Sequence, residues 1–253
     1  MIPADKSRFF EKWFTLYNER WLIKRYFYRV YMRGESDPVS EGQPVLYLMN
    51  HSSWWDGLLV YAVVRQRSKR QHYMMMDEEQ LAKYRFFRRI GAFSIDKQTV
   101  SGIAQSLRYA ENLLKQGHSV WLFPQGDIRH LEERPLNFKN GAAYLLSRVP
   151  EAAVIPVTAY YSFGVNQKPE AGLWFGAPLD DSELAGLKSR EVTYHMSKRV
   201  QDQLDEHRRL AIKAVRGESM TGFYPLFPGS ETTDSRFMSL KRRFSQWRSY
   251  FGR

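Results

Sequence analysis

Cysteine is missing from this chain of 253 residues. Its absence excludes disulfide bonds, thiolate metal ligands and cysteine nucleophiles. It is compatible with a reducing compartment without identifying one. A chain of this length can bury a substantial core, and we expect a single domain that spans residues 1–253.

Long apolar runs are missing as well. The opening stretch, MIPADKSRFFEKWF, has none of the uninterrupted apolar residues of a secretory signal. No segment approaches the roughly 18 consecutive apolar residues that a membrane-spanning helix requires. We therefore expect a protein that does not span a membrane.

Acidic residues are scarce at both ends of the chain. Residues 1–33 carry eight Lys or Arg against three acidic residues, and residues 236–253 carry six basic residues and no acidic one. Residues 34–235 carry 24 of each sign, so the formal net charge of +11 belongs entirely to the two ends. Positive ends favour an anionic surface, either a membrane or a nucleic acid.

The N-terminal segment, residues 1–33, is predicted to be helical, with basic residues around an aromatic face. Its large aromatic residues recur at steps of three and four, which places them on one side of a helix. This face fits a membrane interface, or a helix that caps the sheet. The residues on it are Phe10, Trp13, Phe14, Tyr17 and Trp21.

The C-terminal segment, residues 236–253, is predicted to be a basic amphipathic helix. Such a helix is typical of a segment lying in a membrane interface, where aromatic residues enter the lipid and basic residues meet the head groups. The alternative is a terminal helix that packs its apolar stripe on the protein. The apolar residues are Phe237, Leu240, Phe244, Trp247 and Phe251, and the basic residues between them are Lys241, Arg242, Arg243 and Arg248.

Apolar runs alternate with helical patterns between residues 45 and 216. This alternation predicts an α/β fold with a central mixed, mostly parallel sheet flanked by helices, between amphipathic N- and C-terminal segments. We expect the catalytic core to be 45–216. Helices are expected from Asp56 onward, in 101–117, in 138–149 and within 182–216, and strands at 45–49, 71–76 (buried), 91–96, 119–124 and 152–161.

A histidine and an aspartate stand five residues apart in VLYLMNHSSWWDGLLV, where a strand ends and a helix begins. His51 and Asp56 would lie about 140° apart on a regular helix, so they can pair only if His51 is in the loop. A carboxylate that holds one imidazole nitrogen frees the other to take a proton from a substrate hydroxyl. The alternative is a structural histidine at the end of a strand.

Two further polar clusters follow predicted strands, where ligand sites of α/β sheets tend to lie. Lys97 ends GAFSIDK and could bind an anion, such as a phosphate on an acceptor, or be a solvated charge beside Asp96. In WLFPQGDIRH, a turn places Gln125, Asp127 and Arg129 in one loop. Arg129 is a candidate phosphate ligand, although an ordinary polar turn fits equally well.

In this order, the segments from Val45 to Tyr160 resemble those of the glycerolipid (lysophosphatidic acid) acyltransferase family. His51 and Asp56 match its HxxxxD signature, with Asn50 before the histidine. GAFSIDK is similar to its GxxFIDR segment, and FPQGDIR to FPEGTR. FKNGAA looks like the lysine-glycine segment that follows, and VIPVTAY like the closing strand. Together these segments are far more specific than any one of them.

The resemblance implies acyl transfer from acyl-CoA or acyl carrier protein to a lipid hydroxyl, without a metal or a resident cofactor. It makes His51 the general base and Asp56 its orienting partner, at the cytoplasmic face of a membrane. Trp54 and Trp55 are candidates for lining an acyl groove, with core packing as the alternative. The candidate substrate-binding residues are Asn50, Lys97, Gln125, Gly126, Asp127, Arg129 and Lys139.

Three departures from the family pattern put the acceptor in question. Gln125 replaces a glutamate, Asp127 a threonine and Lys97 an arginine, and an added aspartate should repel a phosphate. A glycosylated lipid or other neutral alcohol is therefore an alternative to a lysophosphatidic acid-like acceptor. Two further alternatives are an inactive relative that binds lipid and a basic nucleic-acid-binding protein. The last leaves the neutral middle unexplained, and no nucleic acid partner is expected.

Overall fold

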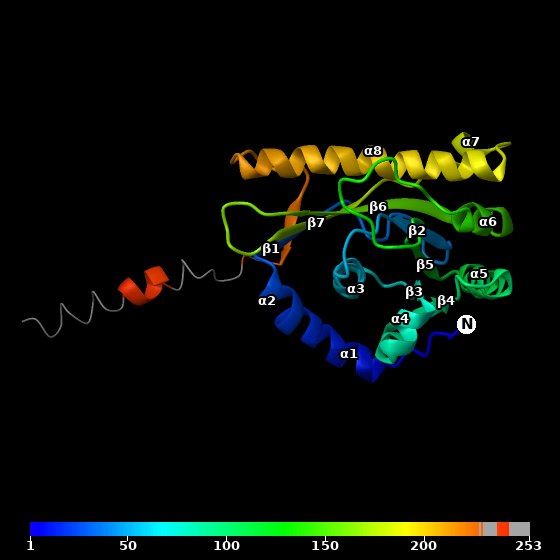
Figure 1. Ribbon diagram of the computed structural model, residues 1–253, viewed down its shortest axis with the longest axis horizontal. Coiled ribbons are helices and arrows are strands. Elements are labelled where there is room, and N and C mark those ends of the chain that lie inside the picture. The colour runs from blue at the N-terminus through cyan, green and yellow to red at the C-terminus, as the bar shows by residue number, and fades with distance from the viewer. Residues whose placement is uncertain (228, 230–236, 243–253) are drawn as a thin grey trace, which may run out of the picture.

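The computed structural model describes residues 1–227, 229 and 237–242 (Figure 1). Its centre is one sheet of eight strands in the order β4-β3-β5-β2-β6-β7-β1-β8. Five of the seven neighbouring pairs are parallel, and helices cover both faces. The predicted α/β fold with a mixed, mostly parallel sheet is confirmed. None of the helices in the described residues is both long and apolar enough to cross a membrane.

One half of the sheet consists of five neighbouring parallel strands. Their carboxyl ends meet at one edge, so the loops that follow them are brought together although they are far apart in sequence. The strand β2 lies between β5 and β6, with Val45 opposite both Ser119 and Ala153. The five strands are β4 (Ala92–Ile95), β3 (His72–Asp77), β5 (Ser119–Leu122), β2 (Val45–Met49) and β6 (Ala153–Ser162).

The rest of the sheet has three strands, and two of them, at residues 29–33 and 224–227, lie outside the predicted 45–216 core. β7 (Glu170–Phe175) is antiparallel to β6, and β1 (Arg29–Arg33) runs parallel to β7. β8 (Tyr224–Phe227) pairs antiparallel with β1. The prediction of a helical segment through residue 33 is therefore wrong for its last five residues. Their alternation of buried and half-buried side chains suits a strand, and the pairing on both sides fixes it.

The unbroken apolar run of β2 has two buried faces. Tyr47 and Met49 pack in the same cluster as residues of α3 (Asp56–Arg67). Leu46 and Leu48 pack on the opposite face, against three helices. A strand covered on both sides needs no polar alternation, which explains why all five residues are apolar and buried. The three helices are α5 (Val100–Lys115), α6 (Gly141–Arg148) and α8 (Ser189–Val215).

The N-terminal arm combines α1 (Arg8–Tyr17), a π-helical stretch η1 (Asn18–Ile23) and a short α2 (Lys24–Tyr26). Phe14 is buried against α3, whereas Phe9, Trp13 and Trp21 are exposed. Ring centroids 5.5 to 6.2 Å apart join Phe10 to Trp13 and Phe14, and Tyr17 to the same two rings, so these four aromatic residues share the face that the spacing predicted. Trp21 lies in the π-helical stretch, where the rotation per residue changes.

The remaining elements border the parallel half or lie near the end of the chain. β3 was predicted to be buried, but all six of its residues are half-buried because it lies second from the sheet edge.

Residues 237–242 are helical and exposed, which includes Phe237, Leu240, Lys241 and Arg242. The other predicted membrane-contact residues, Arg243, Phe244, Trp247, Arg248 and Phe251, lie outside the described residues. The short helices are α4 (Glu78–Lys83), η2 (Arg85–Ile90) and α7 (Asp181–Leu184).

Candidate active site

His51 and Asp56 pair at the carboxyl end of β2. His51 lies in the loop after the strand, and Asp56 is the first residue of α3, so the chain folds back between them. His51 Nδ1 and Asp56 Oδ2 are 2.8 Å apart. The imidazole is 23% exposed while the carboxylate is fully buried. The pairing that a regular helix would forbid is therefore made in the loop, as the spacing had suggested.

The loop itself holds the Asp56 carboxylate in place. The backbone N–H groups of Ser52 and Ser53 donate to Oδ2 at 2.8 and 2.9 Å. Because Oδ2 accepts all these contacts, the hydrogen between it and His51 belongs to Nδ1. Nε2 of His51 therefore keeps the lone pair, which is the arrangement that a general base needs.

The second carboxylate oxygen of Asp56 is held by Tyr161, the last but one residue of β6. The Tyr161 hydroxyl donates to Oδ1 at 2.5 Å. Burial, together with the neighbouring Asp56 charge, raises the pKa of Tyr161 well above 10, so the phenol remains a donor. Asp56 thus links the loop after β2 to the end of β6.

The backbone of His51 is fixed by the loop that follows β5. Its N–H donates to Gln125 Oε1 at 2.9 Å, and its carbonyl accepts from the Arg129 N–H at 2.9 Å. Its ring stacks on Phe123, with the centroids 4.4 Å apart. Gln125, proposed from the sequence as a substrate contact, is buried and serves to position His51.

Asn50 does not face a substrate, which corrects its assignment to the substrate-binding set. Its side chain is completely buried, and both ends of its amide are used inside the protein. Nδ2 donates to the Ala159 carbonyl at 3.1 Å and Oδ1 accepts from the Ala159 N–H at 2.8 Å. Asn50 extends the pairing between β2 and β6 by one residue and so fixes the start of the His51 loop.

Lys97 is held between two carboxylates. Its Nζ lies 2.9 Å from Asp77 Oδ2 and 2.8 Å from Asp127 Oδ1, and it donates to the Gly126 carbonyl at 3.1 Å. Burial opposes the charge of Lys97, but the hydrogen bonds with Asp127 and Asp77 outweigh it and raise its pKa. The hydrogen bond from Lys97 in turn lowers the pKa of Asp127. The negative charge that Asp127 adds is therefore paired with Lys97 inside the protein.

A small polar pocket borders this loop. It has a volume of about 120 Å³ and is lined by Gln125, Arg129, Glu133, Asn137 and Lys139. Arg129 Nη1 lies 4.0 Å from Glu133 Oε1. Gly126 has φ +85°, and a Cβ there would lie 3.3 Å from Lys139 Cε, so glycine permits both the turn and the close approach of Lys139. The structure thus brings Arg129 and Lys139 together at this pocket, and two of its lining residues, Gln125 and Arg129, also hold the His51 backbone.

The two tryptophans of the loop have different environments. The Trp55 ring lies 5.1 Å from Phe27 and 5.2 Å from Tyr26, and it packs against the core. Trp54 is half exposed and forms an edge contact with Trp55 at 5.5 Å. Trp55 therefore packs against the core, which was the alternative prediction for the two tryptophans. Trp54 alone remains accessible to an acyl chain.

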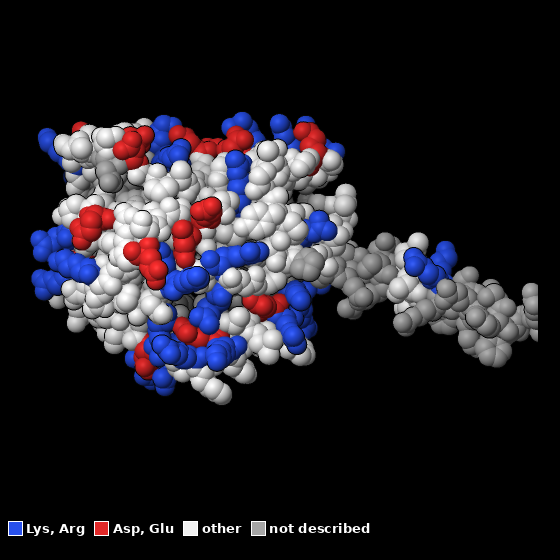
Figure 2. Space-filling view, turned by 180° about the vertical axis from the view of Figure 1, so that it is seen from behind, with Lys and Arg blue, Asp and Glu red and all other residues white. Residues whose placement is uncertain are grey.

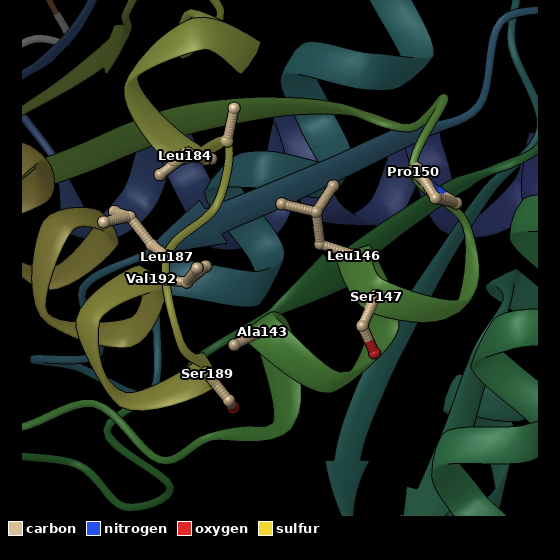
Figure 3. A pocket seen from close by; sticks show the side chains of 9 residues that line it. Ala143, Leu146, Ser147, Pro150, Leu184, Leu187, Ser189 and Val192 are labelled. Atoms are coloured by element: carbon tan, nitrogen blue, oxygen red, sulfur yellow. The ribbon is translucent and has the colours of Figure 1, made fainter.

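An apolar groove of about 490 Å³ lies between α6 and the segment from α7 to the start of α8 (Figure 3). Leu146, Leu184, Leu187 and Val192 contribute to its lining. Pro150, also at its edge, precedes the amino end of β6, whereas His51 follows the carboxyl end of the parallel β2. The groove is therefore at the opposite end of the sheet and is not assigned to the site.

Sequence reasoning missed three residues of the site: Tyr161, Asp77 and Phe123. Each lies at or just beyond the carboxyl end of a predicted strand, which was the available signal. Among the residues that the structure describes, no group of three or more His, Asp or Glu side chains could hold a metal ion.

The fold and the motifs can now be compared with known proteins. No curated protein matches the chain in sequence. A crystal structure of the 1-acyl-sn-glycerophosphate (LPA) acyltransferase PlsC from Thermotoga maritima matches with a TM-score of 0.59 and 17% sequence identity. The match covers 78% of this chain and 79% of the other, and at this identity it establishes a shared fold.

The acyltransferase family matches residues 29–160. This range includes β1 and ends at Tyr160 in β6, so it contains the His51–Asp56 pair and the loops that follow β2, β3, β4 and β5. The match covers more than half of the 253 residues. The chain therefore belongs to the acyltransferase family.

Proposed function

We propose that this enzyme transfers a fatty acyl chain from acyl-CoA or acyl carrier protein to a lipid hydroxyl, with His51 as the general base and Asp56 as its orienting partner. The observation that carries the proposal is the 2.8 Å contact between His51 Nδ1 and Asp56 Oδ2. The partly exposed imidazole keeps Nε2 available to an acceptor. The match to the T. maritima enzyme makes lysophosphatidic acid one of the acceptors to test.

The proposed reaction needs only the two substrates and one shuttled proton. His51 Nε2 takes the proton from the acceptor hydroxyl while its oxygen attacks the thioester carbonyl carbon. The buried Asp56 carboxylate stabilises the imidazolium that forms. The carbon–sulfur bond then breaks, and the departing thiolate takes the proton from Nε2. An ester and a free thiol leave the site.

The absence of cysteine makes this reaction easy to follow with a thiol reagent. With acyl-CoA as donor, every thiol that appears is a product of transfer or hydrolysis, because the protein contributes none. His51→Ala should lower kcat/KM about 10²–10⁴-fold, which is the usual contribution of a general base. His195→Ala, on the exposed side of α8, is the matched control and should retain full activity. Near-normal turnover by His51→Ala would rule out the mechanism.

We also propose that the N-terminal arm docks the enzyme on the cytoplasmic surface of a membrane, where acyl-CoA and acyl carrier protein are found. Phe9, Trp13 and Trp21 are 84%, 54% and 62% exposed. Exposed aromatic residues among basic ones are typical of interfacial helices. The exposed basic residues of the arm are Arg8, Lys12, Arg20, Lys24 and Arg25.

The arm is continuous with the candidate site, which supports this orientation. Trp55 of the His51 loop contacts Tyr26 of α2, and the half-exposed Trp54 contacts Trp55. In Figure 2, Lys and Arg side chains gather along the lower side of the molecule, where Figure 1 places α1 and α4. A lipid acceptor could reach His51 from this side without a spanning helix.

A further inference from the structure

The loops at the carboxyl edge of the sheet contain a carboxylate clamp, formed by Asp77, Lys97 and Asp127. Its three residues come from the ends of β3, β4 and β5. Both carboxylates lie within 2.9 Å of the same Nζ. The clamp therefore holds one positive and two negative charges, and its lysine is already neutralised inside the protein.

The clamp adjoins the polar pocket, and the loop after β5 connects both of them to His51 through hydrogen bonds. Gln125 accepts from the His51 N–H, and Gly126 accepts from Lys97 Nζ. The pocket adds Arg129 and Lys139 as cations and Glu133 as an anion. Clamp and pocket together contain three basic and three acidic side chains, so the surroundings of the acceptor are close to electroneutral.

This balance is unfavourable for a phosphate monoester and favourable for hydroxyl groups. A phosphate oxygen at neutral pH mainly accepts hydrogen bonds, as a carboxylate does, so Glu133 repels it, while Lys97, which could attract it, is already paired with Asp77 and Asp127. Binding of a dianion normally relies on an excess of Arg or Lys. A hydroxyl both donates and accepts, and it can use the carboxylates, the amides and the cations of this lining.

We infer that the acceptor carries a neutral, hydroxyl-rich head group, such as a glycerol or sugar unit, in place of a phosphate monoester. The inference rests on the proposed function for the position of the acceptor beside His51. The pocket volume of about 120 Å³ equals the liquid volume of roughly four waters, which suits part of such a head group.

The experiment compares acceptors that differ only in the phosphate. 1-Octanoylglycerol and its 3-phosphate are titrated by calorimetry into the His51→Ala protein, which cannot turn over, and octyl glucoside serves as a second neutral probe. The neutral ligands should bind at least ten-fold more tightly than the phosphate at physiological salt. Asp127→Asn should reduce this ratio by about ten-fold or more, because it removes a negative charge and releases Lys97. Asp77→Asn is the second variant, and its amide oxygen can still cap α4.

Asp202→Asn is the matched control, because Asp202 pairs with a lysine at a distance of four residues on the exposed side of α8. It should leave the binding ratio unchanged. Preferential binding of the phosphate by the unaltered pocket, or an unchanged ratio in Asp127→Asn, would overturn the inference. Turnover that survives His51→Ala would instead refute the proposed mechanism, and the binding ratio would still decide the nature of the acceptor.

Discussion

The Tyr161 hydroxyl lies 2.5 Å from Asp56 Oδ1, on the side of the carboxylate away from His51. The two residues are more than a hundred positions apart in sequence and come from β6 and from the start of α3. His51, Asp56 and Tyr161 therefore form a chain of hydrogen bonds that begins in the loop after β2 and ends in β6. Tyr161 reaches no substrate in this arrangement and acts by positioning Asp56.

Tyr161→Phe is expected to lower kcat about 10–100-fold, the usual effect of removing a partner that orients a functional group. KM for donor and acceptor should stay nearly constant, because the hydroxyl does not face them. Tyr160→Phe is the control: the Tyr160 hydroxyl donates to Glu132, away from Asp56. An equal loss in both variants, or a change confined to KM, would show that Tyr161 does not act through Asp56.

Asp56→Asn should lower kcat/KM by about 10²–10⁴-fold in the thiol-release assay. The amide removes the negative charge that stabilises the imidazolium, and its NH₂ group faces either the Tyr161 hydroxyl or the N–H groups of Ser52 and Ser53. Circular dichroism at 25 °C should show an intact fold. Full activity in a folded Asp56→Asn protein would mean that His51 works without its partner.

The double variant Phe9→Ala, Trp13→Ala should weaken binding to anionic vesicles by about ten-fold or more. Each of these exposed rings would be buried in the bilayer interface, and such burial typically contributes about 1.5–3 kcal/mol. Vesicle co-sedimentation measures the loss, and turnover of a soluble short-chain acceptor should change little. Tyr194→Ala, exposed on α8, is the control. Equal binding by the double variant and the control would exclude this face.

Acidification should destabilise the fold through His72 and His207, two histidines whose charged form is disfavoured by their removal from solvent. Burial, with Lys6 and Arg70 nearby, lowers the pKa of His72 to about 3, and burial near Arg33 lowers the pKa of His207 to about 3. Their unfolded pKa is about 6.5, so the unfolded state binds more protons below that pH, and stability is lost as the pH falls. Between pH 7 and 5.5 each histidine should cost about 1 kcal/mol.

Urea denaturation at the two pH values measures this difference in the free energy of unfolding. The variant His207→Gln should lose about half of the pH dependence, whatever its absolute stability. The exposed His195→Ala should keep all of it. A free energy of unfolding that does not change between pH 7 and 5.5 would contradict the neutral state of both histidines.

The sequence predicted the parallel half of the fold well because each strand there is a compact apolar run followed by a helical pattern. β2 and the start of α3 at Asp56 lie where the pattern placed them. β1 and β7 were missed because short strands of five or six residues are fixed mainly by pairing with distant neighbours. Such pairing leaves little trace in local sequence.

For the site, the sequence identified which side chains gather but not what they touch. Asn50 and Gln125 were expected to contact the substrate, yet Asn50 binds the backbone of Ala159 in β6 and Gln125 binds the backbone of His51. Lys97 was expected to meet an anion of the acceptor, and it meets Asp77 and Asp127. Hydrogen-bond partners depend on tertiary geometry at the level of an ångström, which residue spacing does not encode.

The pairing of β1 with β8 determines where the two terminal segments join the sheet. Phe227 lies opposite Val30, and a Cβ at Gly229 would lie 3.3 Å from Arg29 Nη2, so the chain leaves the sheet a few residues from where α2 enters it. The N-terminal arm and the chain that continues after residue 229 are therefore attached to the sheet close to each other. If both basic terminal segments bind one anionic membrane, binding of the first raises the local concentration of the second, and the two contacts together would hold the enzyme more tightly than either alone.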